Sequence, residues 1–161
     1  MKRVLMITLA IMLVLLVSCS GTDETQQSPE PEQKTENAEE STEMRSITMT
    51  INDKKVEVKW EDNDSVRALA ELAAGSTLTI DTSLYGGFEQ VGSIGVTIPS
   101  SDVNMTTDPG DIVLYAGSNM VLFYGSNSWS YTRLGHIENM SESELEELLG
   151  SGSVKITLAV E

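Results

Sequence analysis

The residues best suited to chemistry gather in one stretch, Gly125–Ile137, which reads GSNSWSYTRLGHI. It holds a tryptophan, Trp129, a tyrosine, Tyr131, an arginine, Arg133, and the one histidine of the chain, His136. Histidine is the usual acid–base residue near neutral pH, but it needs an orienting partner, and the sequence around His136 offers none. We therefore expect His136 to be an exposed turn residue, and we look to the aromatic residues and the arginine for a binding site.

Arg133 permits two interpretations. On an alternating strand it would share a face with Tyr131 and Ile137, while Leu134 would take the other face. An arginine beside aromatic residues can bind the carboxylate of a ligand, or it can pair with an acid of its own domain. We favour the structural pair.

A groove lined by aromatic side chains is the binding site that this composition suggests. One wall would come from the stretch above and the strand before it, and the opposite rim from a glycine-rich segment further upstream. The candidate residues for this groove are Phe123, Trp129, Tyr131, Arg133, Tyr85, Phe88 and Glu89. The alternative is that these aromatic side chains only build a core or anchor loops.

The charge balance and the small number of cysteines and histidines argue against nucleic-acid binding and against a zinc or copper site. The 161 residues contain 10 Lys and Arg against 25 Asp and Glu, for a net charge of −15. Nucleic-acid binding requires clustered cations, so we expect no nucleic-acid partner. One cysteine allows no disulfide within the chain, and one cysteine with one histidine cannot supply the usual ligands of zinc or copper. We expect no metal and no cofactor.

The first residues have the pattern of a secretory signal. Lys2 and Arg3 precede an apolar run from Val4 to Val17 that is short for a spanning helix. Residues 16–19, Leu-Val-Ser-Cys, resemble the bacterial lipobox, in which the cysteine is lipidated and becomes the new N-terminus. We predict a lipoprotein signal peptide over residues 1–18 and a lipid anchor on Cys19. The alternative is a plain signal peptide with an incidental cysteine.

Residues 19–45 are predicted to be the lipidated cysteine followed by a disordered acidic tether. The segment Ser20–Glu43 has eight acidic residues and one lysine, and it lacks Leu, Ile, Val, Phe, Trp and Tyr. It cannot bury enough apolar surface to offset the entropy of ordering. Acyl chains on Cys19 would hold the protein on a bilayer. The predicted location is the cell envelope, lipid-anchored at the extracytoplasmic face.

Residues 46–161 are predicted to form one folded domain, mainly of strands. Alternating or continuous apolar runs predict strands near residues 47–51, 56–60, 78–80, 112–115, 120–124, 131–137 and 154–160. The glycine-dense segment 86–95 predicts bends in a curved sheet.

Two short helices complete the predicted domain. Asn63 or Asp64 would cap the first, which Gly75 would end. Ser141-x-x-Glu144 is a capping box for the second, before Gly150. The sum is a closed β-barrel of about eight strands with two short helices, one at each end.

The segments GDIVLY, VLFYG and SYTRLGHI, in this order of elements, resemble the bacterial cyclophilin-like domain family over about residues 46–160. The resemblance implies a small barrel of cyclophilin type. True cyclophilins are peptidyl-prolyl isomerases that bind an X-Pro peptide in an apolar groove, where an arginine and a glutamine act on the amide. They need no cofactor.

Carried over by position, the resemblance makes Phe123 a pocket aromatic and puts Tyr131 at the pocket histidine. Val121 stands where the glutamine belongs, and His136 where an exposed lysine sits. The segment that supplies the arginine has no counterpart, and residues 84–90 only loosely match the Phe-x-x-Gln-Gly-Gly-Asp motif.

The function indicated by these residues is a membrane-anchored module that binds a peptide or small ligand in an aromatic groove. The alternative is a divergent peptidyl-prolyl isomerase that assists the folding of exported proteins. A structural or adaptor lipoprotein without a groove is the third interpretation.

Overall fold

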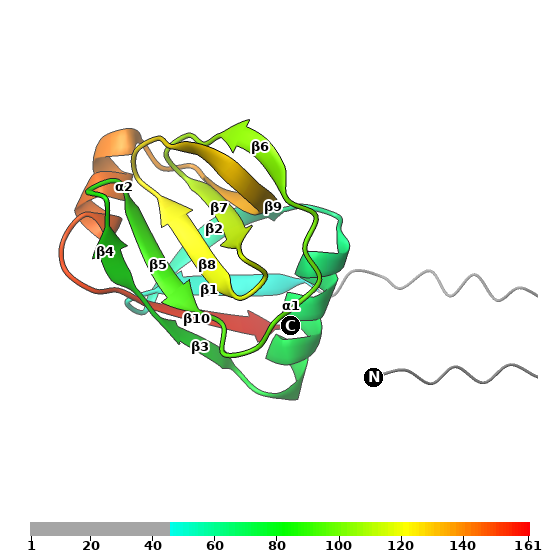
Figure 1. Ribbon diagram of the computed structural model, residues 1–161. Coiled ribbons are helices and arrows are strands. Elements are labelled where there is room, and N and C mark those ends of the chain that lie inside the picture. The colour runs from blue at the N-terminus through cyan, green and yellow to red at the C-terminus, as the bar shows by residue number, and fades with distance from the viewer. Residues whose placement is uncertain (1–45) are drawn as a thin grey trace, which may run out of the picture. The chain divides into compact units, whose positions relative to one another are not determined.

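The computed structural model describes residues 46–161 (Figure 1). The predicted signal peptide, the lipid anchor on Cys19 and the acidic tether lie outside the described residues. Residues 46–161 belong to one compact unit. This unit contains every described strand and helix together with their hydrophobic core, so it folds on its own. Within residues 46–161, no helix combines the length and apolar character needed to span a bilayer.

Ten strands form one antiparallel sheet that curls into a nearly closed barrel. The strands are β1 (Ile47–Ile51), β2 (Lys54–Trp60), β3 (Leu78–Asp81), β4 (Ser83–Tyr85), β5 (Glu89–Ser93), β6 (Val103–Thr106), β7 (Asp111–Tyr115), β8 (Asn119–Phe123), β9 (Ser128–Glu138) and β10 (Lys155–Val160). Their order in the sheet is β3-β10-β1-β2-β9-β7-β8-β5-β4, and β6 pairs with β9 beside this path. The predicted mainly-β barrel with two helices is confirmed.

The two ends of the sheet meet at Thr82, the single residue between β3 and β4. Its amide donates to the carbonyl of Val154 at 2.9 Å, and its hydroxyl lies 2.8 Å from Oε1 of Gln90. At Gly92 on β5, a Cβ atom would lie 2.6 Å from Cγ2 of Ile80 on β3. Glycine therefore allows β5 to approach β3 closely enough to bring the barrel near closure.

The helices α1 (Asp64–Gly75) and α2 (Glu142–Leu149) lie at opposite ends of the barrel in Figure 1. Asn63 caps α1 by accepting a hydrogen bond from the amide of Val66, and Ser141 and Glu144 form the predicted capping box of α2. The end of α1 differs slightly from the prediction, because the helix includes Gly75. Both helices pack apolar side chains on the main core.

Strands β7 and β8 are buried on both faces. Ile112, Leu114 and Leu122 belong to the main core inside the barrel. Val113 and Val121 belong instead to a second, smaller cluster on the outer face, together with Phe123 and Tyr131. Burial on two faces explains why these strands read as continuous apolar runs and do not alternate.

Three of the ten strands fall outside the ranges predicted from the sequence, where about eight strands were expected. One is β5, which lies in the glycine-dense segment 86–95, and the other two are short. They are β4 and β6, whose side chains are almost all exposed. An exposed edge strand carries no apolar alternation, and so it leaves little trace in the sequence.

Candidate functional site

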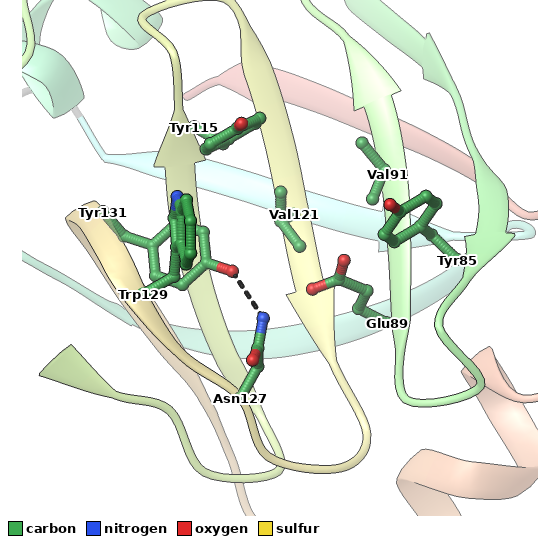
Figure 2. Close-up of a pocket in the computed structure, with 8 residues that line it drawn as sticks. All are labelled: Tyr85, Glu89, Val91, Tyr115, Val121, Asn127, Trp129 and Tyr131. Atoms are coloured by element: carbon green, nitrogen blue, oxygen red, sulfur yellow. Dashed lines mark hydrogen bonds between the residues drawn. The ribbon is translucent and has the colours of Figure 1, made fainter.

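A pocket of about 420 Å³ lies on the outer face of the barrel wall (Figure 2). Its lining side chains come from β4, β5, β7, β8, β9 and the loop before β9. They are Tyr85, Glu89, Val91, Tyr115, Val121, Asn127, Trp129 and Tyr131. A volume of this size is suited to a small molecule or to one or two side chains of a peptide.

Strand register places the floor and one wall of the pocket. Tyr85 pairs with Glu89 across β4 and β5, and Glu89 pairs with Phe123 across β5 and β8. Val91 pairs with Val121 in the same way. Side chains two residues apart on a strand share a face, so these residues all reach the outer side of the sheet.

Aromatic packing beneath the pocket fixes its floor. Phe123 is fully buried, with its ring centroid 6.4 Å from that of Phe88 and 5.7 Å from that of Tyr131. The rings of Tyr115 and Tyr131 meet edge to face at 6.0 Å. Among the predicted groove residues, Phe123 and Phe88 therefore lie under the pocket and support its lining.

The walls rise into solvent on opposite sides. Tyr85 is 68% exposed on one side, and Trp129 is 59% exposed on the other. Figure 2 shows both side chains beside the pocket, with the carboxylate of Glu89 between Tyr85 and Tyr131. The hydroxyl of Tyr131 accepts a hydrogen bond from Nδ2 of Asn127 at 3.0 Å.

Glu89 is the one charged side chain among the eight that line the pocket. It is only 5% exposed, and its Oε2 has no hydrogen-bond partner among residues 46–161. Burial raises the pKa of this carboxyl from 4.5 to about 7. Burial and the nearby Glu89 also raise the pKa of Tyr131 above its ordinary value. The pocket thus joins an aromatic lining to a carboxyl that has no partner.

Arg133 does not line this pocket, although it lies on the outer face with Tyr131 and opposite Leu134, as predicted; only Ile137 departs from the predicted alternation. A bulge in the pairing of β7 with β9, between Ile112 and Val113, shifts the alternation. Leu134 and Ile137 both join the main core, while the guanidinium of Arg133 lies 2.5 Å from Oδ1 of Asp111. The arginine makes a structural pair, the interpretation that the sequence favoured.

His136 is not a turn residue as predicted. It lies within β9, and its Nδ1 is 2.9 Å from the same Asp111 oxygen that contacts Arg133. Burial would raise the pKa of Asp111, but hydrogen bonds from the Asp108 amide, His136 and Arg133 hold it below its ordinary value. This cluster ties β7 to β9, and none of its residues lines the pocket.

A second, more open depression lies near the start of α1 and includes Arg133 and Asp64 among its lining residues. Arg67 at this depression is already paired with Asp62 and Asp64. In the part of the chain that the structure describes, no group of three or more His, Cys, Asp or Glu residues is arranged to hold a metal ion.

The pattern of a family described as "Cyclophilin-like family" matches residues 49–159, from β1 to β10. The chain belongs to the cyclophilin-like family. No curated protein and no solved structure matched it in the corresponding searches. The matched region spans every element that builds the pocket.

The cyclophilin-like domain does not bring an arginine and a glutamine to this pocket. Its described arginines are Arg67 and Arg133, and both are engaged with acids elsewhere. Gln90 points to the opposite side of β5 from Glu89, where its Nε2 donates to the carbonyls of Leu149 and Gly152 at 2.6 and 2.8 Å. Gln90 therefore joins the barrel to the segment after α2.

Sequence reasoning found four lining residues of the cyclophilin-like domain, and it missed Val91, Tyr115, Val121 and Asn127. Val121 lies within a continuous apolar run of β8, so its outward direction can be recognised only once both faces are known to be buried. Tyr115 ends such a run, and an aromatic residue at that position was the one available signal. The role of all eight in binding a ligand stays a prediction.

Proposed function

We propose that this cyclophilin-like domain is a binding module that takes a small molecule or a short peptide segment into the outer-face pocket. The observation that carries the proposal is the pocket itself, in which exposed aromatic walls enclose a buried carboxyl without a partner. Such a carboxyl destabilises the empty domain, and a ligand that donates a hydrogen bond to it would relieve this cost.

Binding is favoured over prolyl isomerisation, because isomerisation requires a donor close to the proline nitrogen. Among the eight lining residues, the side-chain donors are Asn127, the Trp129 indole, the tyrosine hydroxyls and Glu89 in its protonated form. None of these is the cation that true cyclophilins use.

One experiment on residues 40–161 separates the two functions. A protease-coupled assay on an Ala-Pro peptide measures isomerisation, and a ¹H–¹⁵N spectrum of the same sample measures binding. We expect no turnover above the uncatalysed rate. Turnover that is lost in Tyr131→Ala but kept in Trp60→Phe would overturn the proposal in favour of an isomerase.

The two tryptophans make the binding measurement specific. The Trp129 indole lines the pocket, whereas the Trp60 indole donates to the carbonyl of Ile47 at 2.9 Å and serves as an internal reference. A small-molecule ligand in the pocket should shift the Trp129 signal and leave the Trp60 signal in place. A fragment library that never produces this pattern would count against a binding module.

We also propose that the domain is anchored to the extracytoplasmic face of a membrane through acylated Cys19, with residues 20–45 as a spacer. The support is the leader and lipobox pattern at residues 1–19. In a bacterial expression host, the full chain should partition into detergent and carry the mass of a lipid. Cys19→Ser should lose both properties, and a soluble, unmodified wild-type chain would refute the anchor.

A further inference from the structure

The chemistry of the pocket narrows the class of ligand, if the proposed binding function holds. Glu89 is the only formally charged group among the lining residues, and the tyrosine, tryptophan, valine and asparagine side chains around it are neutral. Within the pocket, this one carboxylate therefore attracts a positively charged ligand and repels a negatively charged one. The acidic chain, with a net charge of −15, also attracts cations and repels anions at long range.

The unpartnered oxygen sets a second requirement. Oε2 of Glu89 lacks a hydrogen-bond donor within the described residues, and an ionised carboxylate accepts only. Oε2 itself is closed off from the pocket, so a ligand meets the carboxylate where Glu89 lines the pocket, and it should present an N–H or O–H group there. A charged N–H donor forms the stronger bond and also compensates the carboxylate charge.

The aromatic walls set a third requirement that agrees with the first two. Tyr85, Tyr115, Trp129 and Tyr131 surround the opening above Glu89. Aromatic faces attract cations within about 6 Å, and tryptophan does so most strongly. The stem of an alkylammonium group would meet Val91 and Val121 on the apolar floor.

We infer that the pocket binds a primary alkylammonium or guanidinium group, held by the Glu89 carboxylate at its base and by the four aromatic rings around it. A lysine or arginine side chain of a peptide and a free amine share this chemistry. A quaternary ammonium fits less well, because it has no N–H to donate to the Glu89 carboxylate.

The same arrangement makes binding depend on pH. The titratable groups that face Glu89 are Tyr85 from β4, Tyr115 from β7 and Tyr131 from β9, and β8 contributes only apolar side chains. Tyrosines stay neutral near pH 7. Because the cation binds the ionised carboxylate, its affinity should fall about tenfold per pH unit below the Glu89 pKa of about 7 and be constant above it.

The test uses three probes with the same four-carbon stem: butylammonium, butanol and butyrate. Each is titrated into residues 40–161, with the Trp129 and Trp60 indole signals as the readout. Butylammonium should bind, and it should bind more tightly than butanol by about tenfold or more. Glu89→Gln should weaken butylammonium by about tenfold to a hundredfold and remove its pH dependence. Glu71→Gln, which removes an exposed carboxylate on α1, should change neither.

The possible failures are distinguishable. If all three probes shift Trp129 with equal affinity, the pocket binds ligands but the inference about cations is wrong. The same conclusion follows if butyrate binds best, or if affinity rises below pH 7. If no probe shifts Trp129, the proposed binding function fails as well. N-acetyl-lysine amide as a fourth probe supports a peptide ligand if it binds more tightly than butylammonium, and a free amine if it binds more weakly.

Discussion

Replacing Glu89 by glutamine should stabilise the domain at high pH and have much less benefit at low pH. In the folded state burial raises the Glu89 pKa from 4.5 to about 7, so folding disfavours the ionised form. The contribution of Glu89 to stability is therefore most favourable below about pH 4.5, where this carboxyl is protonated in both states. It falls as the pH rises to about 7 and then stays constant.

The size of the effect follows from the two pKa values. A difference from 4.5 to about 7 corresponds to ~3 kcal/mol of unfolding free energy at 1.36 kcal/mol per pH unit. Glutamine has the same shape and does not ionise. The gain of Glu89→Gln over wild type should thus be ~3 kcal/mol larger at pH 8 than at pH 4.5, which is roughly 10 °C in melting temperature for a domain of this size.

The measurement is urea unfolding of residues 40–161 at several pH values between about 4.5 and 8. Comparing the variant with wild type cancels the titration of all other acids. Any constant cost of burying the glutamine amide also cancels, because the prediction concerns the change with pH. Glu71→Gln, with its side chain exposed, should show no such change. A free-energy difference between Glu89→Gln and wild type that is flat over this range would refute the reasoning.

Two further changes test the parts that hold the pocket wall in place. Asp111→Asn should lower the unfolding free energy by about 2 kcal/mol in urea at pH 7, because it weakens the contacts with Arg133 and His136; partial solvation of Arg133 limits the loss. Because the pKa of Asp111 is lowered in the folded state, this loss should shrink below pH 3.8. A loss that stays constant there would contradict this account. Gly92→Ala should cost about 2 kcal/mol in melting experiments, because the added Cβ would lie 2.8 Å from the Asp81 carbonyl oxygen. Gly75→Ala should be neutral or stabilising, because no atom lies within 4 Å of its added Cβ. Equal effects of the two substitutions would argue against the close approach of β5 and β3.

Most strands and both helices could be predicted from local patterns in the sequence. The hairpin at Asn52 and Asp53, both with positive φ, follows the sequence signal of a polar turn between alternating strands. Ser141 caps α2 as predicted, and α1 is capped by Asn63, one of the two residues that the sequence offered. These features depend on neighbours within a few residues, so a single sequence contains enough information to predict them.

The site depends on contacts that the sequence does not reveal. Glu89 is buried because β4, β8 and β9 surround it, and an acid in a glycine-rich segment gives no sign of this. His136 has a partner, Asp111, that lies 25 residues away along the chain. The bulge that turns Ile137 to the core side together with Leu134 arises from the pairing of two strands, which the apolar pattern of either strand alone does not specify.

In the barrel wall that is buried on two faces, alternate residues of one strand serve different roles: some build the main core and others support or line the pocket. On β8, Met120 and Leu122 face the main core while Val121 and Phe123 face the pocket side. Substitutions at outward positions should therefore alter ligand choice with little coupling to substitutions inside the barrel. A family built on this wall can diversify its specificity one outward residue at a time, and the same positions are the natural targets for redesigning the pocket.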